Sequence, residues 1–310
     1  MLRTGLLWLS ESKGMREFAR TNGFARRFAR RFVAGDTVAE GVAAVSALRA
    51  RGLAATLDLL GEAVAEPAEA EAARDVYLDA VDRLAAAGLE VNVSVKLTQM
   101  GFDIDEALCA RNVRAIVERA ARHGGFVRLD MEQSAYTQRT LDFHARQVAP
   151  DFRAHCGVVI QSALRRSAED VEQLVRHGVR VRLCKGAYLE PPAVAYPDKA
   201  DVDRAFVRLM ERLMAHGTYP GIATHDERIL AHAKAFARAR GIAADRFEFQ
   251  MLYGVRRDLQ ERLVADGWRV RVYVPFGSFW YPYLMRRLAE RPANIVFILG
   301  NVAREGVAGR

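Results

Sequence analysis

The chain has 310 residues with a formal net charge of +8, and 51% of its residues are apolar. This length suits one α/β barrel with additions, and the apolar share is enough for a large buried core. No apolar run approaches the roughly 20 residues of a membrane-spanning helix, and the apolar stretch at 6–9 is too short for a secretory signal. Three separated cysteines, Cys109, Cys156 and Cys184, indicate reduced core thiols and show no metal-binding spacing.

The positive charge does not point to one class of partner. A basic balance is typical of proteins that bind nucleic acids, membrane surfaces or anionic ligands. Arginine and alanine are abundant along the whole chain, and such a bias raises the charge without a function. The sequence has no basic run interleaved with aromatic residues and no nucleic-acid motif, so we expect no nucleic-acid partner.

The N-terminal part reads as a helical extension. Phe18, Phe24, Phe28 and Phe32 alternate with arginines at nearly helical spacing. A basic amphipathic helix of this kind packs its apolar face onto its own protein or lies on an anionic membrane. We favour packing and keep membrane docking as the alternative.

Beyond the extension, eight short β-rich runs alternate with longer segments of helical periodicity. This alternation favours parallel strands joined by crossover helices, and eight units favour a closed (β/α)8 or TIM barrel over an open sheet. Without a linker rich in Gly, Ser or Pro, 1–310 reads as one domain, with the extension at 1–50 and the barrel at 51–310. The expected strands are 54–60, 91–97, 126–131, 157–162, 179–185, 221–225, 247–252 and 269–275.

The helix expected before the fifth strand has recognisable ends. Ser167 stands in the position of an N-cap, and Glu169 and Asp170 lie in the first turn, where acidic side chains favour the helix dipole. Gly178 is placed to end this helix. After the fifth strand, the Pro-containing segment 190–201 reads as a loop.

Polar residues gather where the expected strands end. In a (β/α)8 barrel the active site lies at the C-terminal ends of the strands. Taken singly, a strand-end Lys is usually solvated, a lone His is often structural and an Asp is often a helix cap. Chance would scatter such residues over both rims, whereas the strand starts show mostly Ala, Gly, Val and Phe. The C-terminal set includes Lys96, Asp130, Glu132, Gln161, Arg182, Lys185, Thr224, His225, Gln250 and Tyr273.

Cationic side chains outnumber carboxylates in this set, which favours an anionic ligand or a developing negative charge. After the eighth strand, Tyr283, Arg286, Arg287 and Glu290 are spaced i, i+3, i+4 and i+7, so they share one face of an expected helix. A helix across the barrel mouth would let the two arginines bind one carboxylate, while Glu290 steadies a guanidinium or meets an ammonium of the ligand. A solvated helix with ordinary ion pairs is the alternative.

Together these residues resemble the proline dehydrogenase family in its compact monofunctional bacterial form. The match runs from TLDLLGE at 56–62 to RRLAERP at 286–292. Each motif alone is weak, but six in order, each on its expected strand or helix, form a specific signal. They are SVKLTQMG (94–101), VRLDMEQ (127–133), VRLCKGAY (181–188), ATHD (223–226), FQMLYG (249–254) and WYPYLMRRLAE (280–290).

The resemblance implies a distorted (β/α)8 barrel with a C-terminal helix over its mouth and non-covalent FAD at the strand ends. Family members oxidise L-proline to (S)-1-pyrroline-5-carboxylate, the first step of proline degradation to glutamate, by hydride transfer from proline Cδ to FAD N5. The electrons then pass to a membrane quinone. The resemblance therefore implies a cytoplasmic protein, with a peripheral contact at the inner face of the cell membrane as a variant.

The resemblance also assigns roles by motif. Asp130 and Arg182 correspond to the family's active-site pair. The cofactor contacts would be Met131, Gln161, Lys185, Gly186, Ala187, Thr224 and His225. The substrate contacts would be Lys96, Leu252, Tyr273, Tyr283, Arg286 and Arg287, with both arginines and Lys96 at the proline carboxylate. No metal is expected. Asp130 either takes the amine proton or orients Lys96 or Tyr273, and we favour orientation.

The expected chemistry suits these residue types. A neutral amine must release its lone pair, and a cationic cavity disfavours the ammonium form, while Arg182 beside the flavin would stabilise its reduced anion. The absence of a GxGxxG motif agrees with a flavin held at barrel ends. The sequence departs from the family at Ala163, where an aromatic residue is expected, and in the loop 190–201, which receives no role.

Two other classes remain open at this point. One is a class I aldolase-like barrel in which Lys96 forms a Schiff base. The other is a non-enzymatic protein that binds nucleic acid or anionic lipid through its charge. Borohydride trapping and the salt dependence of binding would separate both from a flavoenzyme.

Overall fold

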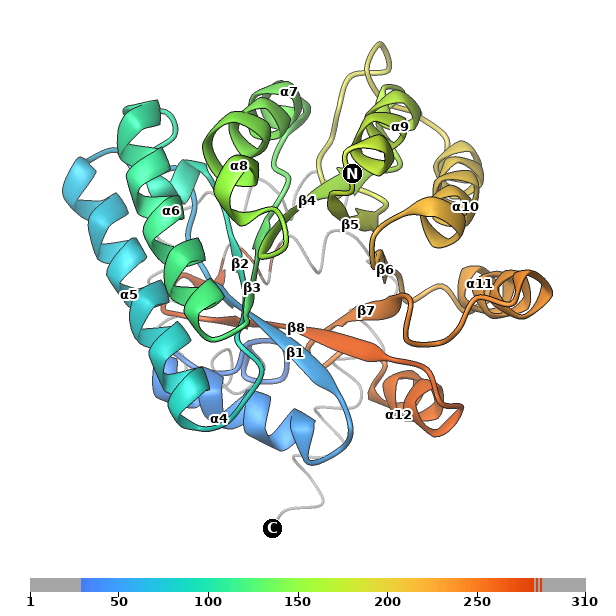
Figure 1. Cartoon of the computed structure of the whole chain (residues 1–310), viewed down its shortest axis with the longest axis horizontal. Helices are drawn as coiled ribbons and strands as arrows, with labels where there is room; N and C mark the ends of the chain where they lie inside the picture. Colours follow the sequence, from blue (N-terminus) through green and yellow to red (C-terminus); the bar gives the residue numbers. More distant parts are fainter. Residues whose placement is uncertain (1–28, 282, 284, 286–310) are drawn as a thin grey trace.

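A computed structural model describes residues 29–281, 283 and 285 of the chain. Within these residues, parallel strands close into a barrel in the order β1 to β8, and β8 pairs with β1. Helices surround this barrel in an outer ring (Figure 1). The predicted (β/α)8 fold is thereby confirmed. The strands are β1 (Ala54–Leu59), β2 (Asn92–Val95), β3 (Phe126–Leu129), β4 (Cys156–Gln161), β5 (Arg180–Cys184), β6 (Gly221–Ala223), β7 (Glu248–Leu252) and β8 (Val270–Phe276).

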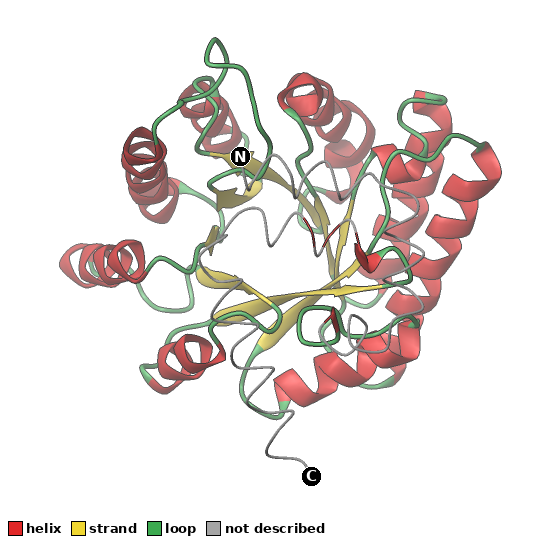
Figure 2. Cartoon of the chain, turned by 180° about the vertical axis from the view of Figure 1, so that it is seen from behind, coloured by secondary structure: helices red, strands yellow, loops and turns green. Residues whose placement is uncertain are grey.

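Seen from behind, the helices again lie outside the strands (Figure 2). They are α4 (Val38–Arg49), α5 (Pro67–Ala86), α6 (Glu106–Arg122), α7 (Ser134–Phe143), α8 (Ala149–Phe152), α9 (Ser167–Arg176), α10 (Lys199–His216), α11 (Glu227–Arg240) and α12 (Arg257–Ala265). A 3₁₀ turn, η1 (Thr98–Met100), follows β2, and a π-helical segment, η2 (His144–Val148), joins α7 to α8. No helix in the described part of the chain is long and apolar enough to span a membrane.

Side chains alternate along each strand between the barrel interior and the surrounding helices. Arg182 of β5 donates a hydrogen bond to Ser94 of β2, a strand across the barrel. The side chains of Arg182 and of every second residue on either side of it along β5 therefore face the interior. The outward-facing positions are apolar and pack under the helices, among them Leu57, Val93, Val127, Val158, Ile222 and Phe249. The interior instead carries buried polar or charged side chains, including Thr56, Asp58, Ser94, Arg128, Arg182, Glu248, Gln250 and Arg271.

The strand starts differ from the sequence-based expectation of small and apolar residues. Arg180 and Glu248 begin β5 and β7, and Glu248 and Arg271 are buried there as an ion pair. Glu248 and Arg271 can be buried because they come from neighbouring strands and neutralise each other, and no residue pattern within one strand signals that pairing.

The ends of α9 were predicted in part correctly. Its acidic first turn and the left-handed Gly178 (φ 66°) after its end are confirmed. Ser167 is not the N-cap, because the helix begins at Ser167 itself and Arg166 occupies the cap position, where its side chain makes no capping hydrogen bond. The Ser167 hydroxyl instead donates to the carbonyl of Gln161, 2.6 Å away, and so ties α9 to the end of β4.

The segment before β1 belongs to the barrel wall in part. Helix α4 packs against β1, β8 and α5 and takes a place in the outer ring (Figure 1). Ahead of it, Phe32 is buried in a second apolar cluster with Leu60 and Trp280. Phe32 therefore packs on its own protein, as predicted. Phe18, Phe24 and Phe28 lie outside the described residues.

The three cysteines all lie in the described part of the chain, and none of them forms a disulfide bond. Cys109 and Cys156 are buried as expected, whereas Cys184 at the end of β5 is only partly buried. Burial raises the pKa of the Cys156 thiol to about 12, which keeps it protonated and unreactive at neutral pH.

Candidate active site

Two buried ion pairs lie at the C-terminal end of the barrel. Lys96 Nζ, just after β2, is 2.7 Å from Asp58 Oδ1 of β1. Arg182 Nη1 of β5 is 2.7 Å from Asp130 Oδ1, which follows β3. Tyr273 of β8 joins the second pair, since its hydroxyl donates to Asp130 Oδ2 at 2.8 Å. The structure thus brings together Lys96, Asp130, Arg182 and Tyr273, which the sequence placed in one site.

The Arg182 guanidinium is fixed on three sides. Besides Asp130, it donates from Nη2 to Ser94 Oγ at 3.1 Å and from Nε to Gln250 Oε1 at 2.5 Å. Its carbon also lies 5.3 Å from the centre of the Tyr273 ring, within cation–π range. With 6% of the residue exposed, Arg182 has one well-defined orientation and a guanidinium whose charge is little screened by solvent.

The same geometry identifies what Asp130 binds. Its two oxygens accept from Arg182 and Tyr273, and Lys96 is held by Asp58 instead. Asp130 therefore has the contacts of a residue that orients the tyrosine and the arginine. The expectation that it orients Lys96 directly is not what the hydrogen bonds show.

Electrostatics in the cluster keep Lys96 charged and Tyr273 neutral. Burial opposes the charged form of Lys96, but the carboxylates of Asp58 and Asp130 outweigh burial and raise the pKa of Lys96 above its usual value. Burial raises the pKa of the Asp58 carboxyl, an effect that the Lys96 ammonium opposes. Burial, reinforced by the Asp130 carboxylate, raises the pKa of the Tyr273 phenol well above its usual value. Tyr273 is therefore a permanent hydroxyl donor at neutral pH.

These pairings correct the expectation of a strongly cationic cavity. Lys96 and Arg182 are each matched by a carboxylate, and Asp58 is the partner that the sequence reading overlooked. Lys185, a third expected cation, is paired with Asp203 at 2.5 Å and Asp226 at 3.2 Å. Among the described residues, the interior cluster is thus close to neutral.

The state of Lys96 also weighs against a Schiff-base enzyme. A Schiff-base lysine attacks as a neutral amine and needs a lowered pKa. Lys96 has a raised pKa and a carboxylate partner 2.7 Å away. The aldolase-like alternative is therefore the weaker reading of this site.

The loops after β4 and β5 meet beside the cluster. Gln161 Nε2 at the end of β4 donates to the carbonyl of Glu132 at 2.9 Å. Gly186 has a φ of 110°, and a Cβ there would lie 3.0 Å from Gln161 Oε1, so only glycine fits without a shift. The residues Gln161, Lys185 and Gly186 thus converge as predicted, and no fixed partner within the described residues engages the amides of Gly186 and Ala187.

The loops after β6 and β7 are joined on the inside by His225. Its Nε2 accepts from the backbone N–H of Leu252 at 3.0 Å. Because Nε2 is the acceptor, the ring proton of neutral His225 lies on Nδ1. Thr224 Oγ1 accepts from the N–H of Asp226, and Asp226 in turn caps α11 through Arg228 N.

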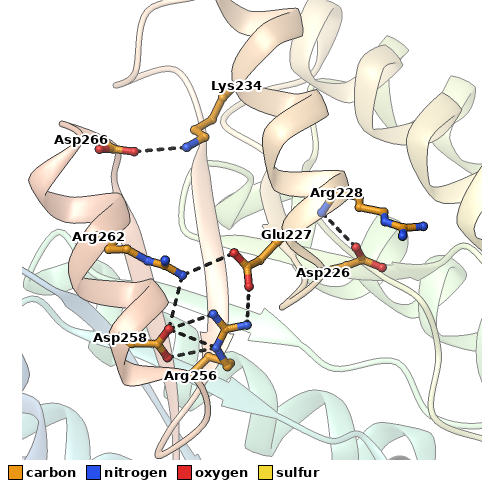
Figure 3. A network of polar contacts seen from close by, with 8 residues as sticks. All are labelled: Asp226, Glu227, Arg228, Lys234, Arg256, Asp258, Arg262 and Asp266. Carbon is orange, nitrogen blue, oxygen red and sulfur yellow. Dashed lines mark hydrogen bonds and ion pairs between the residues drawn. The ribbon is translucent and has the colours of Figure 1, made fainter.

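The same two loops are joined on the outside by Arg256 (Figure 3). Arg256 precedes α12 and adopts a left-handed conformation with φ 49°. Its guanidinium binds Asp258 at 2.8 Å and Glu227, the first residue of α11, at 2.8 Å. Arg262 contacts both of these carboxylates as well. This surface network joins the loop that carries His225 to the loop that follows Leu252 of β7.

The segment 190–201, which the sequence left without a role, is a loop only up to Asp198, because α10 begins at Lys199. This loop packs onto its neighbours. Glu190 accepts from the backbone N–H of Ser134 at 2.7 Å and from its hydroxyl. Farther on, Ala195 forms an isolated β-bridge with Leu164. The backbone N–H of Tyr196 donates to the carbonyl of Ala163. The loop therefore ties the connections after β3, β4 and β5 to one another at the rim.

The other predicted contacts divide into buried or partly buried side chains and residues outside the described part of the chain. Met131 is buried and Leu252 partly buried at their strand ends. Tyr283 is buried in the apolar cluster with Phe32 and Trp280. Arg286, Arg287 and Glu290, the proposed carboxylate clamp, lie outside the described residues.

Sequence reasoning missed Asp58 and Ser94, and it gave Gln250 no partner. All three occupy inward-facing positions of otherwise apolar strands and are at most 5% exposed. The sequence could have indicated these residues through polar side chains at every second position of a strand. Alternate side chains point to opposite faces, so those polar residues share the face toward the interior. Asp58 lies one residue before the end of β1, within reach of Lys96 after β2.

Comparison with known proteins gives a consistent picture. The family model described as proline dehydrogenase matches residues 42–299. A proline dehydrogenase of Deinococcus radiodurans is 43% identical over 303 residues, which cover 96% of this chain and 97% of the relative. Proline dehydrogenase 1 of Bacillus subtilis is 41% identical, with coverage of 98% and 100%.

Longer proteins contain a similar unit. The bifunctional protein PutA of Escherichia coli is 26% identical over 88% of this chain but only 24% of its own length. Among solved structures, proline utilization A from Bdellovibrio bacteriovorus, inactivated by N-propargylglycine, superposes with a TM-score of 0.81 at 25% identity. The match covers 97% of this chain and 40% of that one, so the likeness is to one part of a larger polypeptide.

Proposed function

The chain belongs to the proline dehydrogenase family, and we propose that it oxidises L-proline to (S)-1-pyrroline-5-carboxylate with FAD as cofactor. Proline oxidation is the first step of proline catabolism. The observation that carries the proposal is the buried set of Asp130, Arg182 and Tyr273 at the C-terminal end of the barrel. This is the end of the (β/α)8 fold at which active sites lie.

The residues at the rim suit a bound dinucleotide. The left-handed Gly186 presents the amides of the Lys185–Ala187 turn without a side chain in front of them, which is the arrangement that favours phosphate oxygens. Lys185 adds a cation beside this turn, although Asp203 and Asp226 share its charge. Met131, Gln161, Thr224 and His225 would complete the contacts. When bound, FAD would accept the hydride from proline Cδ at N5.

The chain's own residues would bind and orient the substrate. Lys96 is a charged donor at the mouth that Asp58 holds in place, and it suits one oxygen of the proline carboxylate. Arg286 and Arg287 would bind the same carboxylate from the helix that the sequence predicts after β8. Leu252, Tyr273 and Tyr283 would surround the pyrrolidine ring and keep water away from the reacting carbon.

Asp130 would act through its neighbours. It fixes the hydroxyl of Tyr273 and the guanidinium of Arg182, whose positive charge would stabilise negative charge that develops on the cofactor. A fixed arrangement of this kind needs no reorganisation during the reaction.

We also propose that a quinone accepts the electrons and that the protein is cytoplasmic, with a peripheral contact at the inner face of the membrane. Three large apolar side chains on the C-terminal side of the barrel support this contact. Leu189 and Val194 follow β5 and Phe279 follows β8, with exposures of 62%, 41% and 59%. Co-sedimentation with anionic vesicles, compared between the native chain and Leu189→Ser, would test it.

The decisive experiment is an anaerobic titration. The purified protein, supplied with FAD, should show flavin absorbance that bleaches on addition of L-proline and not of D-proline. Borohydride added with a carbonyl substrate should leave Lys96 unmodified. A protein that cannot bind FAD, or whose flavin stays oxidised with L-proline, would refute the proposal.

A further inference from the structure

A buried glutamine links Arg182 to charges deeper in the barrel. Gln250 of β7 accepts from Arg182 Nε through Oε1 at 2.5 Å and donates through Nε2 to Glu248 Oε1 at 2.5 Å. Glu248 and Gln250 are 4% and 5% exposed, and both face the interior because they are two residues apart on one strand. The amide therefore stands between a permanent donor and a carboxylate.

The carboxylate decides which way the amide points. An ionised carboxylate only accepts hydrogen bonds, whereas a side-chain amide has a donor end and an acceptor end. Burial opposes ionisation of Glu248, but Arg271 outweighs burial and lowers the pKa of this carboxyl below its usual value. Gln250 must then turn its NH2 group to Glu248 and its oxygen to Arg182.

Glu248 is itself fixed by an ion pair with Arg271. Arg271 Nε of β8 lies 2.7 Å from Glu248 Oε1, and the remaining Arg271 nitrogens bind the carbonyl of Ala55 and Glu90, each at 2.7 Å. The chain of contacts thus runs from Arg182 to Glu90, whose side chain is 54% exposed. Each member has its partners, so the arrangement has little freedom.

The neighbouring strand leaves room for this amide. Gly221 of β6 pairs with Glu248 of β7, and a Cβ at Gly221 would lie 2.4 Å from Gln250 Nε2. Any side chain at this position would push the amide away from its two partners. Gly221 has no need of a left-handed conformation, so the space for Gln250 is the physical reason for a glycine here.

We propose that Gln250 and Glu248 are positioning residues for Arg182. Glu248 orients the amide of Gln250, and the oriented amide fixes the Arg182 guanidinium against Asp130. This inference rests on the proposed function, because it assigns the effect to the step in which Arg182 acts. A purely structural role would lower stability without changing that step.

The test compares stopped-flow reduction of the bound flavin by L-proline in three variants. Gln250→Met removes both hydrogen bonds at similar volume. Glu248→Gln offers a donor as well as an acceptor, so it lets the amide of Gln250 turn over. The exchanged variant, Glu248→Gln with Gln250→Glu, again gives Arg182 Nε an obligatory acceptor and keeps the charge of the network.

Both single variants should reduce flavin about tenfold more slowly, the effect of losing one hydrogen bond to a charged group, while the proline KM changes less than about twofold. The flavin reduction potential should become more negative, because a displaced cation stabilises the reduced anion less. The exchanged variant should recover most of the rate.

The matched control is Asp170→Asn, which also converts a buried carboxylate to an amide but on α9, where Asp170 binds Arg166. It should lower stability and leave the reduction rate unchanged. Single variants with native reduction rates and potentials, or an exchanged variant as slow as Glu248→Gln, would overturn the inference. Failure of the native protein to be reduced by proline would instead refute the proposed function.

Discussion

Lys96 and Asp58 form an ion pair 2.7 Å long that is almost wholly shielded from solvent, with side-chain exposures of 13% and 1%. The two residues come from neighbouring strands, 38 positions apart in the sequence. A buried pair contributes little net stability, but the loss of one partner leaves an uncompensated charge in the interior. The pair therefore makes a sharp test of the site.

Asp58→Asn should raise the proline KM about tenfold, because a Lys96 ammonium without its carboxylate moves toward Asp130 or loses its charge. It should also lower the free energy of unfolding by about 3 kcal/mol. Steady-state kinetics and urea unfolding measure the two effects. Asp79→Asn, which breaks an exposed pair with Arg83 on α5, is the control and should do neither. A native KM in Asp58→Asn would contradict the role given to the pair.

Tyr273→Phe tests the hydroxyl that Asp130 binds. The change removes one donor from the Asp130 carboxylate and leaves the ring and the Arg182 pair in place, so kcat/KM should fall about tenfold with little change in Tm. Tyr136→Phe is matched, since Tyr136 donates to Asp103 at 2.6 Å on the outer surface. If the two variants were equally active, the tyrosine at the barrel mouth would have no part in the reaction.

Much of this site was predictable from the sequence, and its missing part has a physical reason. The strands β1 to β8 were predicted within a few residues because both faces of each are buried, which selects short β-rich runs. Lys96 and Asp130 were found because they directly follow strands, and Arg182 and Tyr273 because they are polar residues within the apolar strands β5 and β8. Their partners are set by the closure of the barrel and not by local sequence.

The contacts of Arg182 illustrate the limit. Asp130, Gln250 and Ser94 are 52, 68 and 88 residues away from it in the sequence. No pattern within a strand tells which of many polar residues will meet at that range. Ser167 shows the same limit locally, because its hydroxyl was expected to cap a helix and instead binds the end of β4.

Arg286→Met and Arg287→Met test the predicted carboxylate clamp, which rests on sequence alone. Each change should raise the proline KM at least about tenfold, because a charge-assisted hydrogen bond to the carboxylate is lost. The bound flavin content should stay at its native value. Arg111→Met on the exposed side of α6 serves as the control. Unchanged KM values in both clamp variants would remove these arginines from the site.

Arg256 combines a strained backbone with two ion-pair contacts, and the two effects can be separated. Arg256→Ala loses the contacts to Asp258 and Glu227 but keeps φ near 49°, whereas Arg256→Gly loses the contacts and relieves the strain. The glycine variant should be more stable than the alanine variant by about 1 kcal/mol in urea unfolding. As a control within α11, Lys234→Gly should be less stable than Lys234→Ala, because glycine destabilises a helix interior. The same order at both positions would contradict the strain argument.

His144 should make stability depend on pH in a defined window. The residue lies in the π-helical segment η2 and is 2% exposed, and burial lowers the pKa of its imidazole to about 4. The unfolded chain protonates this ring near pH 6.5, so it binds more protons than the folded chain between about pH 6.5 and 4. Stability should therefore fall as the pH drops through that window, by about 3 kcal/mol from this group.

Urea unfolding at a series of pH values between 7.5 and 4 measures this effect as a difference between variants. His144→Gln cannot titrate, so its stability should fall less steeply with acid than that of the native chain. His177→Gln, at an exposed position after α9, should keep the native pH dependence. Identical slopes for the native chain and His144→Gln would mean that the buried ring does not remain neutral.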